Sequence, residues 1–291
     1  MSDALWLDIA GLTVEVTSDA DLPIAAEGSA KKFVTGPGRP ASAHLHARWG
    51  DPCAPSDGEV AFDSGKGLWR LYRTPRGPEV IFTSPALGPQ PYQSATFRED
   101  FREGTVTLRR APFADRLPIY PLHYPLDELF MVHLLARGLG VEIHSGGVVL
   151  PDGRGWLFVG VSGAGKSTLS RIWRGEPDVT VLSDERIILR RQGDGLWMYG
   201  TPWHGDGYIA EPGCARLERV FFLRQGPQNA LAPVSVTDAV TRLFRCGFTP
   251  FHDAAGLDFS LGFLEQVARG CRCEELTFLP DRSVIQFLRD S

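Results

Sequence analysis

The stretch GVSGAGKST, at residues 160–168, decides how the rest of the chain is interpreted. It satisfies the pattern G-x-x-x-x-G-K-[ST], and it stands between the apolar run WLFV and the helical pattern KSTLSRIW. Glycines in such a loop let successive backbone N–H groups face phosphate oxygens, and the helix that follows adds its positive N-terminal end. A glycine-rich turn can match by chance, but the context on both sides favours a nucleotide-phosphate loop. The residues expected to form it are Gly160, Ser162, Gly163, Ala164, Gly165, Lys166, Ser167 and Thr168.

Two residues of this loop carry distinct chemistry. Lys166 is predicted to bridge the β- and γ-phosphates, and the Ser167 hydroxyl is predicted to ligate Mg²⁺. Lys166 is also the only lysine after position 66. The expected cofactors are therefore ATP and Mg²⁺, with GTP as the alternative nucleotide.

The segment before the loop is predicted to be a β-hairpin. Two apolar strands, VEIHSGGVVL (141–150) and WLFVGV (156–161), flank the turn PDGRG. The loop would then follow the second arm of an antiparallel hairpin, whereas ordinary P-loop proteins place a parallel strand there. His144, in the first arm, is expected near the phosphates through cross-strand geometry. A structural role is the alternative for a single histidine on a strand.

Two adjacent acids follow the loop by about 20 residues, in VLSDERIIL (181–189). Asp184 and Glu185 come at the end of an apolar strand, where an acid can meet the metal or the attacking group. One acid can hold Mg²⁺ while the other accepts the proton of an incoming hydroxyl. A surface turn with two acids is the alternative. The pair is predicted to be functional.

A second candidate region is GTPWHGDG (200–207), which has the glycine and proline density of a shaped loop. Its His204 and Asp206 are predicted to belong to an acceptor or nucleotide loop. Arg245 lies on a helix expected over 237–246, where it either neutralises phosphate charge or lies on a solvated face. A further helix is expected over 261–270.

The chain is expected to contain two parts. Residues 1–117 alternate apolar and polar residues between turn formers, which predicts a β-rich N-terminal region. Residues 118–291 are the expected P-loop catalytic domain, an α/β fold with a mixed sheet. The N-terminal region is the candidate for acceptor binding by elimination, because no motif in it indicates a function.

Composition excludes several classes of function. The net charge is −5 and the pI is near 5.8, which argues against a partner of nucleic acid or anionic membrane held by overall charge. The N-terminal residues lack the pattern of a signal peptide, so none is expected, and the sequence has no run of about 18 apolar residues. Five scattered cysteines form no CxxC pair, so neither a zinc site nor a disulfide framework is indicated. The expected location is cytoplasmic.

The loop, hairpin and acids together resemble the HPr kinase/phosphorylase family, whose catalytic core has the phosphoenolpyruvate-carboxykinase-like P-loop fold. The matching segments are IHSGGVVLPDGRGWLFVGVSGAGKSTL (143–169) and VLSDERIIL. Within that superfamily the chain is more similar to the HPr-kinase-like proteins of bacterial biosynthetic clusters, including lasso-peptide clusters. The segments YPLDEL (124–129) and YGTPWHG (199–205) carry that second resemblance.

The resemblance implies roles for individual residues. Asp184 matches the acid that activates the acceptor hydroxyl, Glu185 a metal-associated acid, and His144 the histidine near the reacting phosphate. It also implies a homo-oligomer, because HPr kinases are hexameric. Two departures limit it: Glu185 stands where aspartate is usual, and EPGCARLERVFFL (211–223) replaces the arginine- and glycine-rich signature of true HPr kinases. HPr is therefore not the expected substrate.

The first function hypothesis is a kinase that transfers the γ-phosphate of ATP to a hydroxyl, most readily a serine of a peptide or protein. A small-molecule hydroxyl is the alternative acceptor. A nucleotide-hydrolysing protein and a non-catalytic nucleotide sensor are the competing classes. The sequence argues against the usual nucleotide-hydrolysing classes. It has no LSGGQ signature of an ABC-type ATPase after the loop, and it has no N/TKxD motif with which a GTPase recognises guanine. A carboxykinase would require a further lysine near the metal, and none lies between positions 66 and 166.

Overall fold

The computed structural model describes residues 4–65 and 67–291, and it divides the chain into two compact units. Unit 1 is Met1–Leu134 and unit 2 is Leu135–Ser291. The division therefore falls later than the expected boundary between residues 117 and 118. Hydrogen bonds explain the shift, because the backbone of Ile119 pairs with the segment around Ile24 and the Gln93 side-chain amide donates to the carbonyl of Pro121. These contacts hold the proline-rich segment to unit 1.

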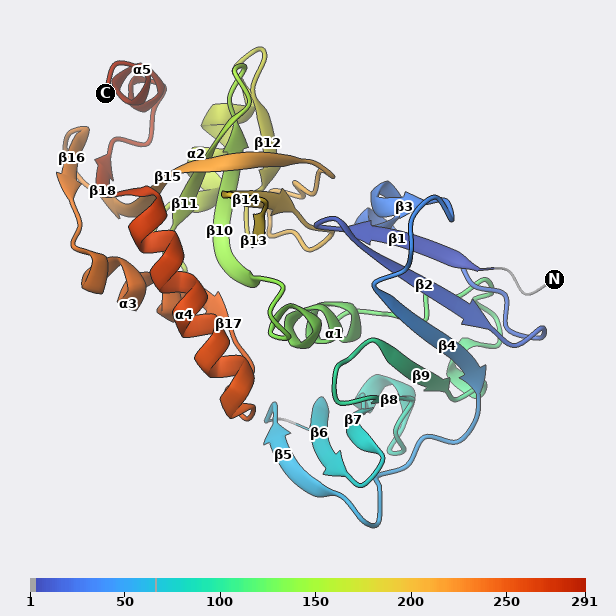
Figure 1. The fold of residues 1–291 in the computed structure, drawn as a ribbon. Coiled ribbons are helices and arrows are strands. Elements are labelled where there is room, and N and C mark those ends of the chain that lie inside the picture. Colours follow the sequence, from blue (N-terminus) through green and yellow to red (C-terminus); the bar gives the residue numbers. More distant parts are fainter. Residues whose placement is uncertain (1–3, 66) are drawn as a thin grey trace. The chain divides into compact units, whose positions relative to one another are not determined.

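Unit 1 is β-rich, as its alternating sequence predicts (Figure 1). Its described strands form one mixed sheet in the order β3-β1-β2-β4-β9-β8-β7-β6-β5. Most neighbours are antiparallel, while β2, β4 and β9 run parallel to one another. The strands are β1 (Leu5–Ile9), β2 (Leu12–Ser18), β3 (Val34–Thr35), β4 (Ala43–Trp49), β5 (Glu59–Asp63), β6 (Trp69–Thr74), β7 (Gly77–Phe82), β8 (Gln93–Phe97) and β9 (Glu103–Leu108).

Helical structure in unit 1 is short. Three 3₁₀ helices cover Gly28–Phe33, Pro85–Leu87 and Ala111–Phe113, and α1 (Leu126–Leu135) ends at the division between the units. Phe130 on α1 stacks on Phe97 of β8 at 5.7 Å between ring centroids. This contact fixes most of α1 to the core of unit 1.

The two faces of the unit 1 sheet differ in chemistry. One face is apolar and buried, because alternate residues of each strand point the same way. The other face carries His44 and His46 on β4, which contact Glu15 and Asp19 at 2.7 and 3.1 Å. A cavity of about 490 Å³ lies on this polar face, and Arg76 also lines it.

Unit 2 contains the P-loop segment and a second mixed sheet, with the main order β11-β10-β13-β14-β15-β18-β16. The α/β class predicted from the sequence is confirmed at this level, while the phosphoenolpyruvate-carboxykinase-like detail stays a prediction. The strands are β10 (Val141–Val149), β11 (Arg154–Val159), β12 (Thr180–Ser183), β13 (Arg186–Gln192), β14 (Gly195–Gly200), β15 (Cys214–Gln225), β16 (Ala230–Pro233), β17 (Gly247–Phe248) and β18 (Arg272–Phe278). The helices are α2 (Lys166–Arg174), α3 (Val236–Cys246), α4 (Ala254–Gly270) and α5 (Ser283–Arg289).

The hairpin predicted before the phosphate loop is confirmed. β10 and β11 pair antiparallel, with Ser145 opposite Val159 and Val149 opposite Gly155. β11 also pairs parallel with β15, so β10, β13, β14, β15 and β11 close on themselves. β12 and β17 add to β10, which makes β10 the strand on which the surrounding segments converge.

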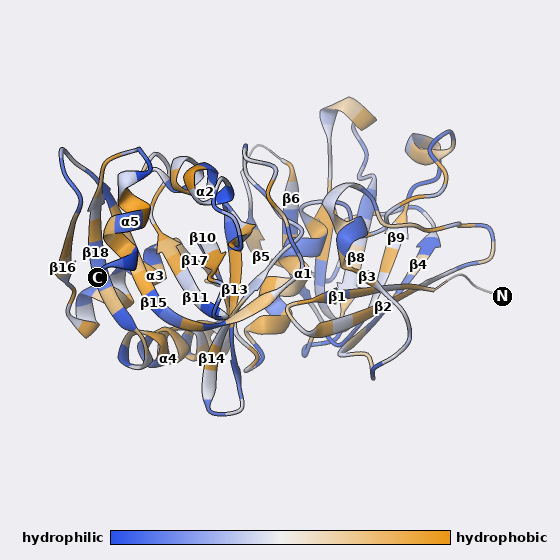
Figure 2. Cartoon of the chain, turned by 90° about the horizontal axis from the view of Figure 1, so that it is seen from above, coloured by the Kyte–Doolittle hydropathy of each residue, from blue (hydrophilic) through white to orange (hydrophobic). Residues whose placement is uncertain are grey.

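Two apolar cores lie on the two sides of β11. Leu157 and Val159 pack in one core with α3 and α4, while Trp156 and Phe158 pack in the other with α2 and α5. The alternation follows from the period of two along a strand. Figure 2 shows both apolar and polar residues on α5, and its apolar residues belong to the second core. The phosphate loop is therefore anchored by a strand that is buried on both faces.

α4 begins earlier than the sequence indicates, at Ala254 instead of 261. The Asp253 side chain accepts a hydrogen bond from the Gly256 backbone N–H at 3.1 Å and caps the added turn. α3 covers Val236–Cys246, in agreement with the expected helix. Within the described residues, no helix combines the length and apolar character needed to cross a bilayer.

Candidate active site

The phosphate loop connects the end of β11 to the start of α2. Gly163 and Gly165 adopt left-handed conformations, with φ of 81° and 103°. A Cβ at Gly165 would lie 2.7 Å from Cζ of Phe278, so a side chain there meets both backbone strain and a clash. The Gln225 side-chain amide donates to the Gly163 carbonyl at 3.0 Å and ties the loop to β15. The strand–loop–helix arrangement predicted from the sequence is thus present, with residues 161–163 exposed.

Lys166 is largely buried at the first position of α2. Its Nζ donates to the backbone carbonyl of Gly160 at 2.6 Å and to that of Val161 at 3.3 Å. Burial is the main cause that lowers the pKa of Lys166, and the positive charge of Arg186 adds to it. An ammonium has three donors, so these two carbonyls leave capacity for a phosphate oxygen.

Asp184 is the most constrained acid of the site. Its side chain is 1% exposed, and its two oxygens accept hydrogen bonds from the Gly205 and Gly207 backbone N–H groups at 3.2 and 2.9 Å. A Cβ at Gly207 would lie 2.4 Å from Oδ2 of Asp184, so only glycine permits this approach. Two backbone donors fix the orientation of the carboxylate. Asp184 is therefore held as an oriented acceptor.

The loop at 200–207 contacts Asp184 through its backbone. The sequence assigned His204 and Asp206 to an acceptor or nucleotide loop, but Gly205 and Gly207 make the contacts with Asp184. The His204 ring packs against Tyr208 at 4.8 Å, and Asp206 is exposed. Sequence reasoning missed the two glycines, although the repeat of glycine in HGDG was the available signal.

Glu185 and His144 belong to a charged cluster centred on Arg186. The Arg186 guanidinium lies 2.9 Å from Oε1 of Glu185 and 3.5 Å from Oε1 of the buried Glu142. His144 Nε2 lies 3.6 Å from the same Glu185 oxygen. Burial lowers the pKa of His144 to about 4, and the positive charges of Lys166 and Arg186 contribute. At neutral pH His144 is an uncharged hydrogen-bonding group, not an acid.

Arg186 was not singled out in the sequence, because an arginine after two acids has the pattern of an ordinary surface pair. Its position opposite His144 in the β10–β13 ladder brings it into the cluster. The guanidinium also lies over the Phe248 ring, 4.4 Å from the ring centroid. Glu185 therefore already has a cationic partner, and this competes with its predicted role as a metal ligand.

The arrangement fits a magnesium ion that is held jointly with nucleotide phosphates. Among the described residues no group of three or more His, Cys, Asp and Glu side chains forms a metal site. Mg²⁺ in phosphate chemistry usually takes one or two carboxylates together with phosphate oxygens, so such a group is not required. A Cβ at Gly146 would lie 3.1 Å from Oγ of Ser170 and 4.0 Å from Cα of Asp184. The glycine brings α2, which carries Ser167, close to Asp184.

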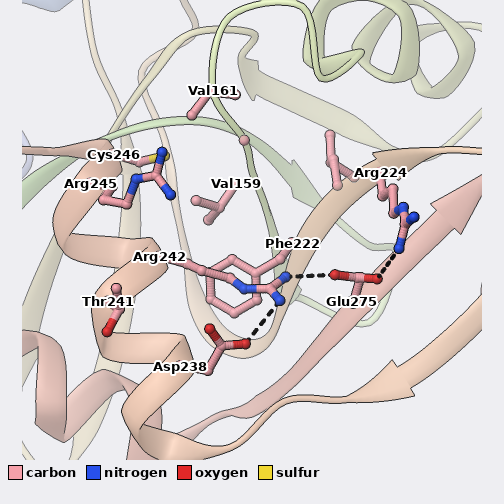
Figure 3. Close-up of a pocket in the computed structure, with 12 residues that line it drawn as sticks. Val159, Val161, Phe222, Arg224, Asp238, Thr241, Arg242, Arg245, Cys246 and Glu275 are labelled. Carbon is pink, nitrogen blue, oxygen red and sulfur yellow. Dashed lines mark hydrogen bonds and ion pairs between the residues drawn. The ribbon is translucent and has the colours of Figure 1, made fainter.

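Arg245 lies at the end of α3, in a pocket of about 490 Å³ that also includes Gly160 and Val161 (Figure 3). The sequence left open whether this arginine belongs to a solvated face. It is exposed, yet it lines the same cavity as the first residues of the phosphate loop. The neighbouring Cys246 is buried, and its thiol pKa is raised by that burial.

Comparisons with known proteins assign no family. No family model matches the sequence, and no curated protein matches it. Solved structures do match, one of them titled "Structure of the Hpr(Ser) kinase/phosphatase from Coxiella burnetii". The two chains are 15% identical, and the match covers 51% of this chain and 95% of the other with a TM-score of 0.28. At that score the likeness carries no functional argument, and the chemistry rests on the site itself.

Proposed function

We propose that the chain is an ATP-dependent phosphotransferase that phosphorylates a hydroxyl group. The observation that carries the proposal is the buried carboxylate of Asp184, which two loop amides orient beside the β-hairpin that bears the phosphate loop. A phosphate loop alone is compatible with any nucleotide-binding protein. An oriented acid beside that hairpin supplies the general base that can take the proton of a hydroxyl acceptor.

In the proposed reaction the acceptor hydroxyl gives its proton to Asp184 while its oxygen attacks the γ-phosphorus. The bond between that phosphorus and the bridging oxygen to the β-phosphate breaks, and ADP leaves. The loop amides and Lys166 stabilise the charge on the phosphates, as in other phosphoryl transfers. Ser167 would hold Mg²⁺, which neutralises phosphate charge when bound.

His144 and Arg186 have supporting roles in this scheme. His144 is uncharged at neutral pH, so it donates or accepts a hydrogen bond near the phosphates without adding charge. Arg186 holds Glu185 at 2.9 Å and thereby keeps the second acid from repelling the nucleotide. Glu185 would reach the metal only by exchanging this ion pair for a metal contact.

The acceptor is proposed to be a serine of a peptide or protein, with a small-molecule hydroxyl as the alternative. Acceptor binding by unit 1 stays a prediction. Its polar sheet face offers a place to examine this, because the cavity beside His44 is lined with Arg98, Thr96 and Thr105. Such a mixture of charged and hydroxyl groups suits a hydrogen-bonding ligand.

The test is phosphate transfer from ATP and Mg²⁺ to a serine-containing peptide library and to a panel of free hydroxy compounds, followed by mass spectrometry. The proposal expects one acceptor class to gain about 80 Da, the mass of one HPO₃ group, and expects Asp184→Asn to abolish the gain. Rapid, saturable hydrolysis of ATP with no phosphorylated acceptor would instead support a nucleotide-hydrolysing protein. Tight ATP binding without turnover, unaltered by Asp184→Asn, would support a sensor.

A further inference from the structure

Three arginines line the pocket beside the phosphate loop, and they differ in their partners. Arg242 contacts Asp238 at 2.9 Å and Glu275 at 2.8 Å. Arg224 contacts Glu275 at 3.5 Å. Arg245 forms no ion pair with an acid in the part of the chain that the structure describes. Its charge is therefore the least compensated of the three.

Arg245 also lies at the end of the pocket nearest the phosphate loop. Figure 3 shows it on the side that carries Cys246, Val159 and Val161, whereas Arg242 and Arg224 point toward Glu275. Gly160 and Val161 line the pocket, and their carbonyls are the ones that accept hydrogen bonds from Lys166. The pocket therefore borders the Lys166 ammonium.

Cys246 provides an independent link between the two cations. Both Lys166 and Arg245 act on its buried thiol, and each of them opposes the increase in its pKa that burial causes. Cys246 is followed by β17, whose Phe248 lies against His144 and Arg186. The end of α3 thus runs along the edge of the cluster that contains Lys166, His144 and Arg186.

In a bound nucleotide, the phosphates that Lys166 is expected to contact include the terminal one. Lysine at this position of a phosphate loop reaches the β- and γ-phosphates, and the nucleoside extends away from them. A cation on the Gly160–Val161 side of the ammonium can therefore approach the γ-phosphate, and ADP lacks that group. An arginine there has the geometry to contact two phosphate oxygens at once.

We propose that Arg245 binds the terminal phosphate of the nucleotide and stabilises it during transfer, so that the pocket beside the loop distinguishes a triphosphate from a diphosphate. This inference rests on the proposed function and extends it to a residue on a separate helix. Arg242 and Arg224 are structural by comparison, because their charges are matched by Asp238 and Glu275.

The direct test is calorimetric binding of ADP and of the non-hydrolysable triphosphate AMP-PNP, each with Mg²⁺, to the wild-type chain and to Arg245→Ala. A lost charge-assisted contact should weaken AMP-PNP binding by about tenfold or more while leaving ADP affinity within about twofold. Arg245→Lys should restore part of the preference for AMP-PNP over ADP, because it returns the positive charge without the paired N–H donors of arginine. Since Arg245 is exposed, the thermal midpoint should not change.

Arg224→Gln is the matched control, since it removes one positive charge from the same pocket at a side chain that is 72% exposed. It should leave the preference for AMP-PNP over ADP intact. Equal losses for both nucleotides in Arg245→Ala, or an equal effect of Arg224→Gln, would overturn the role of Arg245. Absence of binding of either nucleotide to the wild-type chain would instead overturn the proposed function, so the two failures are distinguishable.

Discussion

The phosphate loop and Asp184 are held in contrasting ways. The loop is exposed at residues 161–163, and its lysine is bonded to the loop's own carbonyls. Asp184 is buried and held by two amides from a segment more than 20 residues away. The acid is fixed by backbone donors, while the lysine keeps a donor beyond its two carbonyl partners that a phosphate oxygen can accept.

This difference separates binding from chemistry. Changes in the loop should act first on nucleotide affinity, because Lys166 and the loop amides are expected to contact the phosphates. Changes around Asp184 should act on transfer with binding preserved, because an oriented base contributes only when the acceptor reacts.

The largest effect is expected from Asp184→Asn. The substitution removes the base and leaves one of the two glycine N–H groups facing an amide N–H, so transfer should fall by about 10²- to 10⁴-fold. AMP-PNP affinity should stay within a few-fold of wild type. Turnover with the acceptor found by the phosphorylation screen and calorimetry with AMP-PNP measure the two quantities. A parallel loss of affinity would show that Asp184 belongs to nucleotide binding.

Lys166→Met tests the nucleotide-binding role of the phosphate loop. It removes the ammonium that is expected to contact the β- and γ-phosphates, so affinity for both ADP and AMP-PNP should fall by about 10- to 100-fold. Calorimetry with Mg²⁺ checks this result. Unchanged affinity for both nucleotides would contradict the assignment of GVSGAGKST as a phosphate loop.

Gly207→Ala tests the clamp on Asp184 without altering its carboxylate. The added methyl group would lie 2.4 Å from Oδ2 and 3.0 Å from Cγ of Asp184, which is too short a side chain to move aside freely. We expect a loss of about 1–3 kcal/mol of unfolding free energy together with slower transfer. Denaturant unfolding and turnover measure the two effects.

Gly262→Ala is the matched control for that substitution. Gly262 lies in α4, and no atom lies within 4 Å of the position of an added Cβ. The change should raise stability by up to about 1 kcal/mol through helix propensity and leave transfer unaltered. A similar loss in both alanine variants would mean that the close approach at Gly207 does not determine the effect.

The sequence predicted what depends on local pattern. The hairpin, the loop, α2, α3 and the acids after β12 follow from apolar periodicity and from one strong motif. It did not predict that Gly205 and Gly207 hold Asp184 or that Arg186 joins His144 and Glu185. Those contacts depend on the register of β10 against β13 and on the path of a loop, neither of which residue pattern specifies.

His144 supplies the smallest effect, a pH dependence of stability. Its pKa is about 4 in the folded chain against 6.5 for the free side chain, so the unfolded chain binds more protons between these values. The free energy of unfolding therefore falls as pH decreases from 6.5 toward 4, and the contribution of His144 is retained above pH 6.5. Allowing for solvent screening of a half-buried ring, the loss should be about 1–2 kcal/mol. His144→Gln should flatten this part of the curve in denaturant unfolding.

Nucleotide binding should raise the pKa of His144, and this links the two sides of the site. The causes that depress it are burial and the positive charges of Lys166 and Arg186, and a bound polyphosphate would offset the charges. Imidazole resonances followed by NMR between pH 4 and 7 should therefore titrate at higher pH with AMP-PNP and Mg²⁺ than without them. By linkage, AMP-PNP affinity should increase as pH falls through that range. If the nucleotide leaves the titration of His144 unchanged, the phosphates do not approach the β10 hairpin. His144 would then belong with Asp184 among the groups that the fold fixes, and not with the nucleotide-binding groups.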